Sequence, residues 1–254
     1  MISVLIPTRQ RIKGLDRALR SIWDTSSSEE AVEIVLRCDE DDQETINYLK
    51  GIDRGKHNNL QVLVGPRMDG YKSLPLFVND MAVAAKGYLL FTCNDDVIFK
   101  TRNWDRIVED VASRYPDGIF DIGVNTILNA EIFPFYILSK RWLEIAGCIQ
   151  DPRLIWQSKY IQDVANAFGR TYYIEEVVVE HDWAGFKEDD ITRPDTEKWA
   201  REIVLKDPTA HLHVAESTTD EWRDDYKQVY DKAIAETIEK LKPHLDPSTK
   251  PTRD

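Results

Sequence analysis

Short apolar runs alternate with amphipathic stretches through the first hundred residues. Each run is bounded by polar residues, Gly or Pro, which is typical of a strand buried on both faces of a parallel sheet. The stretches between the runs repeat their apolar residues at helical spacing. In chain order, these runs and stretches lie at residues 3–6, 12–23, 32–36, 46–49, 60–64, 73–85 and 89–91. The alternation predicts an α/β fold with helices on both faces of a mostly parallel, Rossmann-like sheet.

The second half of the chain is less regular and contains longer polar stretches. We expect two of its helices to end at Gly147 and Gly169, because glycine favours the left-handed conformation found after a helix. In the first half, Ser73 is the expected N-cap of a helix with Pro75 in its first turn. Further elements are expected at residues 104–115 and 222–241 as helices, and at 119–124, 133–138 and 172–179 as strands.

We divide the chain into three parts on this pattern. Residues 1–182 form the α/β domain, with one half at 1–100 and the other at 101–182. Residues 183–242 begin as a polar loop, which we expect to be a lid, and continue as a C-terminal helical extension. Residues 243–254 are rich in Pro and polar side chains, and we expect a flexible tail there.

The charge balance limits the partners of the protein. Its 45 acidic and 33 basic residues give a net charge of −12, which argues against nucleic acid or an anionic membrane as the main partner. No apolar run is long enough for a membrane segment and the N-terminus carries no secretory signal, so we expect a cytoplasmic protein. Cys38, Cys93 and Cys148 are odd in number and widely spaced, which indicates neither a disulfide framework nor a zinc motif. The oligomeric state is not indicated.

The chemistry centres on the end of the apolar run Leu89–Phe91. Asn94, Asp95 and Asp96 follow it closely, and the carboxyl ends of parallel strands are where open α/β sheets bind ligands. Two adjacent carboxylates repel each other unless a cation lies beside them. The alternative is that the acids only form a turn, and the local sequence does not decide between the two.

Several common site motifs are absent. The turn after the first strand has no glycine before Gly14, which excludes the glycine-rich loop of a dinucleotide-binding domain. No P-loop, nucleophile elbow or zinc-protease helix is present either. A calcium loop starting at Asp39 fails because Glu44 and Lys50 stand where glycine and glutamate are required.

Several segments together resemble glycosyltransferase family 2, whose enzymes have the GT-A fold. In order, they are the segment Ile2–Arg11, the helix Leu15–Ile22, Asn79, the triplet Asn94–Asp96, the helix Trp142–Gly147, the pair Gln162–Asp163, and His181. The resemblance covers roughly residues 2–182. It implies a transferase that moves a sugar from a nucleotide-diphosphate sugar, with UDP as the expected nucleotide, to a glycan or other hydroxyl acceptor. Residues 1–100 would then form the donor half and 101–182 the acceptor half.

The resemblance implies a divalent metal, Mn²⁺ or Mg²⁺, that stabilises the charge of the departing diphosphate. Asp96, Asp95 and His181 would be its ligands. The family's first motif aspartate falls on Cys93, or on Asn94 if the alignment shifts by one, so Asp96 is the first choice as direct ligand.

The resemblance also implies residues for the donor, the acceptor and the proton transfer. Asp163 matches the catalytic base that would take the acceptor's proton during an inverting transfer. Arg67 and Lys72 lie on a loop that could reach the base or the diphosphate, although solvated surface cations are the alternative. The other donor contacts would be Pro7, Thr8, Arg9, Asp39, Asn94 and Asp95. Aromatic side chains expected on the acceptor side, where core packing is the competing account, are Phe135, Tyr136, Trp142 and Trp156.

Two other functions remain open from the sequence. A nucleotidyltransferase can share the architecture and the acidic site, but it usually has a glycine-rich loop after its first strand, and this chain has none. A non-catalytic nucleotide- or carbohydrate-binding relative of the transferases is the other, because Cys93 replaces a motif acid. Release of nucleoside diphosphate from a nucleotide sugar would distinguish a transferase from both.

Overall fold

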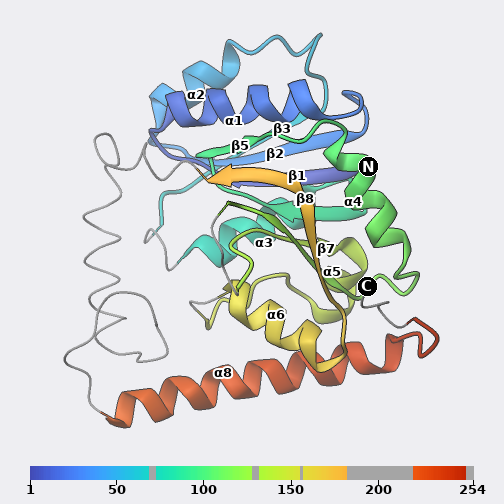
Figure 1. The fold of residues 1–254 in the computed structure, drawn as a ribbon. Coiled ribbons are helices and arrows are strands. Elements are labelled where there is room, and N and C mark those ends of the chain that lie inside the picture. The colour runs from blue at the N-terminus through green and yellow to red at the C-terminus, as the bar shows by residue number, and fades with distance from the viewer. Residues whose placement is uncertain (69–72, 128–131, 155–156, 182–219, 250–254) are drawn as a thin grey trace.

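The computed structural model describes residues 1–68, 73–127, 132–154, 157–181 and 220–249. Its centre is one eight-stranded sheet with the order β3-β2-β1-β4-β7-β6-β8-β5 (Figure 1). The strands are β1 (Ile2–Pro7), β2 (Val32–Asp39), β3 (Leu60–Gly65), β4 (Leu89–Thr92), β5 (Val97–Phe99), β6 (Asp121–Asn125), β7 (Tyr136–Ser139) and β8 (Thr171–His181). The predicted α/β class is confirmed.

The sheet is parallel through β3, β2, β1 and β4, as the alternating pattern predicted. β7 runs antiparallel between β4 and β6, while β8 is parallel to β6. The carboxyl ends of β1, β2, β4 and β8 therefore lie at the same edge of the sheet, opposite the N-terminus in Figure 1. β5 is an additional short strand, antiparallel to the end of β8.

Helices cover both faces of the sheet and enclose two hydrophobic cores (Figure 1). On one face, α1 buries Leu15, Leu19 and Ile22, the apolar positions of its sequence pattern. On the other face, α3, α5 and α6 pack against the sheet, and α8 packs across α5 and α6. The helices are α1 (Ile12–Thr25), α2 (Gln43–Lys50), α3 (Leu74–Ala84), α4 (Trp104–Ser113), α5 (Lys140–Ala146), α6 (Gln157–Ala167) and α8 (Asp220–Leu241).

Several helix ends follow the local chemistry of the sequence. Gly147 and Gly169 adopt left-handed backbone angles, with φ of 88° and 65°, and close α5 and α6 as predicted. Asp42 caps α2 by accepting a hydrogen bond from the Thr45 amide. Ser73 precedes α3 as expected, but its side chain makes no capping hydrogen bond.

The C-terminal part of the described chain is attached to the domain. After α8, a short 3₁₀ helix (Lys242–His244) leads to Asp246. The Asp246 amide donates to Asp117 and its carbonyl accepts from Arg170, both at 2.8 Å. The start of the predicted tail is therefore bound to the body, while the predicted lid lies outside the described residues. Within the described part of the chain, no helix combines the length and the apolar character needed to cross a membrane.

Candidate active site

The loop between β1 and α1 connects the groups at the carboxyl edge of the sheet. The Thr8 amide donates to the Arg37 carbonyl at 3.0 Å, and its hydroxyl donates to Asp95 at 2.8 Å. Gln10 adopts a left-handed conformation, with φ of 52°, and its amide donates to Asp42 at 2.7 Å. Such a conformation is uncommon for a residue other than glycine, and these contacts hold it in place.

Asp95 and Asp96 are buried immediately below this loop, each with a side chain only 3% exposed. Arg11 bridges them, because its Nη1 lies 2.8 Å from Asp95 Oδ1 and its Nη2 lies 2.8 Å from Asp96 Oδ2. His181 Nε2 lies 3.1 Å from the other oxygen of Asp96. The structure therefore brings together Asp95, Asp96 and His181, the three residues predicted as metal ligands.

The short strand β5 explains how His181 reaches the acids. Val97 pairs with His181 across the β5–β8 ladder, so the residue directly after Asp96 is tied to the end of β8. Phe135 stacks edge-on against the His181 ring at a centroid distance of 5.1 Å and closes one side of the group.

The two carboxyl groups differ in their electrostatics. Burial raises the pKa of Asp95 to about 7, even though Arg11 and the Thr8 hydroxyl lower it. Burial also raises the pKa of Asp96, but His181 and Arg11 offset this and leave that pKa below its ordinary value. Asp96 is therefore the more firmly ionised of the two acids at neutral pH.

The side chains of Asp95, Asp96 and His181 partly fit the requirements of a divalent metal site. Asp96 Oδ1 is buried, lacks a well-aligned hydrogen bond and faces His181, and oxygen and imidazole nitrogen donors both suit Mn²⁺. Asp95 is the third possible metal ligand, but its ion pair with Arg11 keeps its carboxylate apart from Asp96 and His181. Among the described residues, no three metal-binding side chains are gathered in one ready site. Asp96 and His181 would hold the metal, and Asp95 could join them if Arg11 moved.

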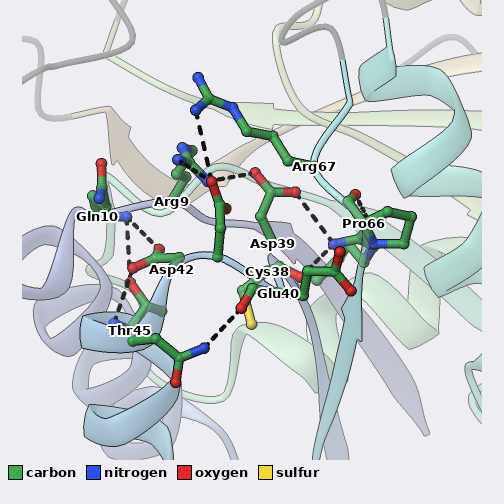
Figure 2. Close-up of polar contacts among 12 residues, drawn as sticks. Arg9, Gln10, Cys38, Asp39, Glu40, Asp42, Thr45, Pro66 and Arg67 are labelled. Atoms are coloured by element: carbon green, nitrogen blue, oxygen red, sulfur yellow. Dashed lines mark hydrogen bonds and ion pairs between the residues drawn. The ribbon is translucent and has the colours of Figure 1, made fainter.

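A second cluster of charges lies at the carboxyl end of β2 (Figure 2). Asp39 is held from two directions, by Arg9 Nη1 at 2.9 Å and by Arg37 Nη1 at 3.5 Å. Arg9 also makes two hydrogen bonds to Asp41, at 2.6 and 3.1 Å. Arg67 approaches Asp41 at 3.7 Å from the loop after β3. Three of the predicted donor contacts, Arg9, Asp39 and Arg67, are thus brought together.

Arg37 is the buried centre of this second cluster. Its guanidinium donates to the Pro66 carbonyl at 3.0 Å and to the Cys38 carbonyl, and it lies over the Phe77 ring at 4.4 Å. Gly65 lets the guanidinium pass, since a Cβ there would lie 2.8 Å from Arg37 Nη2. One side chain therefore connects β2, the loop after β3 and α3.

The predicted base, Asp163, lies on α6 and faces α8. Lys159 Nζ is 2.6 Å from its carboxylate, and the Tyr230 hydroxyl donates to it at 2.8 Å. The neighbouring Gln162 accepts a hydrogen bond from the Phe133 amide. None of the described partners of Asp163 belongs to either charged cluster.

The remaining predicted residues lie in several environments. Pro7 and Asn94 are half-buried at the same sheet edge, whereas Lys72 and Trp156 lie outside the described residues. The expectation that Tyr136 and Trp142 line an acceptor site is wrong, because Tyr136 on β7 and Trp142 on α5 are both buried in the core. Phe135, expected there too, is equally buried and packs against His181. Their aromatic surface is used for packing. Cys93, at the position of a motif acid, is likewise a buried core residue.

Sequence reasoning did not single out Arg11 or Arg37. Arg11 was noted only as part of the first strand-end segment, and Arg37 lies inside a run that forms a strand. A cation inside a buried strand is rare unless its charge is paired, so Arg37 did carry a usable signal. Arg11 carried none, because its partners are 84 and 85 residues away.

Comparison with known proteins supports the fold. No protein-family model matches the sequence, and no curated protein matches it. Among solved structures, S. aureus TarS 1-349 matches with a TM-score of 0.55 and 15% identity, over 94% of this chain and 71% of that chain. The mannosyltransferase PcManGT from Pyrobaculum calidifontis, in complex with GDP-Man and Mn²⁺, matches with a TM-score of 0.57 and 11% identity, over 95% and 74%.

A further match is S. aureus TarS 1-349 in complex with UDP-GlcNAc, with a TM-score of 0.55 and 13% identity, over 94% of this chain and 72% of that chain. At such low identities the likeness shows the fold. The GT-A fold expected from the sequence, with α8 as a C-terminal helical extension, is confirmed.

Proposed function

We propose that this chain is a glycosyltransferase that moves a sugar from a nucleotide-diphosphate sugar to an acceptor hydroxyl. The observation that carries the proposal is the pair of adjoining charged clusters at the carboxyl edge of a GT-A sheet: the buried acids Asp95 and Asp96, and the Arg9–Asp39 group. Solved structures of this fold hold GDP-Man with Mn²⁺ and UDP-GlcNAc. The two clusters suit the two ends of such a donor.

The Arg9–Asp39 group has the chemistry to bind the nucleoside. Asp39 accepts hydrogen bonds and is held rigidly, so it can receive base N–H or ribose hydroxyl groups. Arg9 and Arg67 add donors that can reach carbonyl or phosphate oxygens. We propose UDP as the nucleotide, since uracil offers one N–H between two carbonyls and thus matches a carboxylate with arginines beside it.

The acidic cluster would bind the diphosphate end through a divalent cation. When bound, that cation would supply Lewis-acid stabilisation of the leaving diphosphate. Asp96 and His181 would hold it, and Asp95 would contribute a further oxygen. Phe135 keeps one side of the imidazole dry, which fixes the ring for this role.

We propose Asp163 as the general base of an inverting transfer. Its carboxylate is partly exposed on α6, and the family resemblance supports the role. Its contacts with Lys159 and Tyr230 would have to loosen before it could accept a proton from the acceptor. An acceptor hydroxyl that replaced the Tyr230 hydroxyl would receive the same geometry.

The test is a donor screen. The protein is incubated with Mn²⁺ and a panel of nucleotide sugars, and released nucleoside diphosphate is measured, with Asp96→Asn as the inactive control. We expect release from at least one UDP-sugar in the native protein alone. Tight donor binding without release or transfer to any offered acceptor would identify a non-catalytic relative, and release of pyrophosphate from a nucleoside triphosphate and a sugar phosphate would identify a nucleotidyltransferase.

A further inference from the structure

Arg11 already neutralises part of the acidic pair. Its guanidinium contacts both carboxylates at 2.8 Å, one nitrogen to each, and it is 80% buried while doing so, with an exposed fraction of 20%. A guanidinium is permanently charged and its planar fork suits two oxygen acceptors at once. The positive charge between Asp95 and Asp96 is therefore supplied by the chain itself.

The backbone around Arg11 fixes this arrangement. Arg11 is the residue before the first turn of α1, and Gly14 in that turn packs against the Asp95 backbone. A Cβ on Gly14 would lie 2.9 Å from the Asp95 carbonyl oxygen, so only glycine permits such close approach. The start of α1 thus packs closely against the turn that carries Asp95 and Asp96, which places the Arg11 side chain within reach of both carboxylates.

The charges place Arg11 in competition with any cation that uses these acids. Arg11 brings one positive charge to two carboxyl groups that together carry at most two negative charges, so the site keeps at most one net negative charge while the guanidinium is in place. A divalent cation is attracted by the net negative charge of the site, so its binding weakens while the guanidinium is in place. A cation alone would therefore meet a partly neutralised site.

We propose that Arg11 is the resident counter-ion of the acidic pair and a binding residue for the donor diphosphate. It keeps divalent-cation binding weak until the donor arrives. The negative diphosphate then draws the guanidinium off Asp95 and Asp96 and frees their oxygens for the metal that enters with it. This inference rests on the proposed function, and it assigns to Arg11 a role beyond holding the fold.

The test measures the metal directly, without turnover. Mn²⁺ binding to the full chain is followed by electron paramagnetic resonance, first alone and then with saturating UDP, in the native protein, Arg11→Gln and Arg11→Lys. Arg20→Gln is the matched control, because Arg20 lies on the exposed side of the same helix and forms its ion pair with Asp16, one turn earlier. Melting temperatures are recorded for all four proteins.

We expect Arg11→Gln to bind Mn²⁺ without UDP about tenfold more tightly than the native protein, and to bind UDP in the presence of Mn²⁺ about tenfold more weakly. Arg11→Lys should fall between them, since it keeps the charge but loses the fork. Arg20→Gln should match the native protein in both measurements. A purely structural Arg11 would instead lower the melting temperature and weaken both ligands together.

The outcomes separate this inference from the proposed function. Unchanged or weaker Mn²⁺ binding in a folded Arg11→Gln overturns the counter-ion role, while Mn²⁺-dependent UDP binding by the native protein would still support the transferase. If Arg11→Gln does not fold, Arg11→Lys decides in the same way. Absence of Mn²⁺ binding from every protein, with and without UDP, overturns the metal assignment itself and this inference with it.

Discussion

Two regions are built differently: the carboxyl edge of the sheet, where we propose that the donor binds (the donor edge), and the region around α6, where we propose that the acceptor binds (the acceptor side). At the donor edge, the loop after β1 contacts the end of β2 and the turn after β4 through ion pairs and through hydrogen bonds that involve side chains. On the acceptor side, the predicted base on α6 is in contact with α8, 67 residues further along the chain. Under the proposed function, donor recognition would be fixed by the sheet, whereas the acceptor chemistry would depend on how α8 packs against α6.

The largest expected effect comes from the acidic pair. Asp96→Asn keeps the shape of the side chain but removes the charge that would hold the cation, so we expect turnover to fall by about 10³ or more. Calorimetry should show UDP binding that no longer responds to Mn²⁺. Asp41→Asn is the control. Asp41 is an exposed carboxylate of the second charged cluster, away from Asp96, so this variant should keep the Mn²⁺ response. An Mn²⁺ response that survives in Asp96→Asn would contradict the metal assignment.

The acceptor side is tested by Asp163→Asn. This change removes the proton acceptor and keeps the shape, so we expect turnover to fall by roughly 10² to 10⁴ with little change in UDP affinity. Turnover is measured with the nucleotide sugar that the donor screen identifies, and UDP affinity is measured by calorimetry. Tyr230→Phe is the control: it removes one hydrogen bond to the same carboxylate and should leave turnover within a few fold. Near-normal turnover in Asp163→Asn, or a product that retains the anomeric configuration, would contradict this role.

Gly65→Ala disturbs the donor edge without touching a charge. The new Cβ would lie 2.8 Å from Arg37 Nη2, so the guanidinium must shift and Asp39 loses one of the two arginines that hold it. We expect the donor KM to rise about tenfold with kcat changed far less, because the contact to the nucleoside is lost while the diphosphate end is intact. Gly55→Ala is the matched control, since its closest neighbour is the movable Asp53 side chain at 3.1 Å. Equal KM values in both variants would argue against the Arg37 contact.

The smallest expected effect on function comes from Asp121, which lies outside both the donor edge and the acceptor side and affects stability. Asp121 is fully buried on β6, both its oxygens lack hydrogen bonds within the described part of the chain, and burial raises its pKa to about 8. Between the ordinary pKa near 4 and this value, the folded state holds a proton that the unfolded state releases, so stability falls as the pH rises through that window.

Urea unfolding between pH 5 and 9 tests this expectation. Asp121→Asn stays neutral at every pH, so its urea midpoint should fall less than that of the native protein as the pH rises. The exposed Asp110→Asn should follow the native curve. Parallel curves for native protein and Asp121→Asn would show that this carboxyl does not titrate in the window.

The sequence predicted the donor edge better than the acceptor side for a physical reason. Apolar runs bounded by turn residues located β1, β2, β3 and β4, and parallel strands bring their carboxyl ends together without further information. Strand β5 was missed because three residues after an acidic turn carry too little pattern. The antiparallel direction of β7 was missed as well, because the spacing of apolar residues does not indicate in which direction a strand pairs.

Side-chain partners far apart in the chain account for the rest. The contact of Asp163 with Tyr230 depends on α8, and nothing near residue 163 indicates it. Aromatic side chains such as Tyr136 and Trp142 can either stack on a sugar ring or pack in the core, and only their burial in the structure distinguishes the two roles. For Arg11, the acids it bridges become neighbours only once β1 and β4 pair.

The left-handed turn at Gln10 has a consequence for how the protein can change. On either side of it, Arg9 contacts Asp39 at the end of β2 and Arg11 contacts the acids after β4. Under the proposed function, these two contacts would lie at the two ends of the donor, and the distance between those ends would be set by the nucleotide. An insertion or deletion of a single residue here would put one arginine out of reach, so this loop should tolerate substitution at its exposed positions but keep its length.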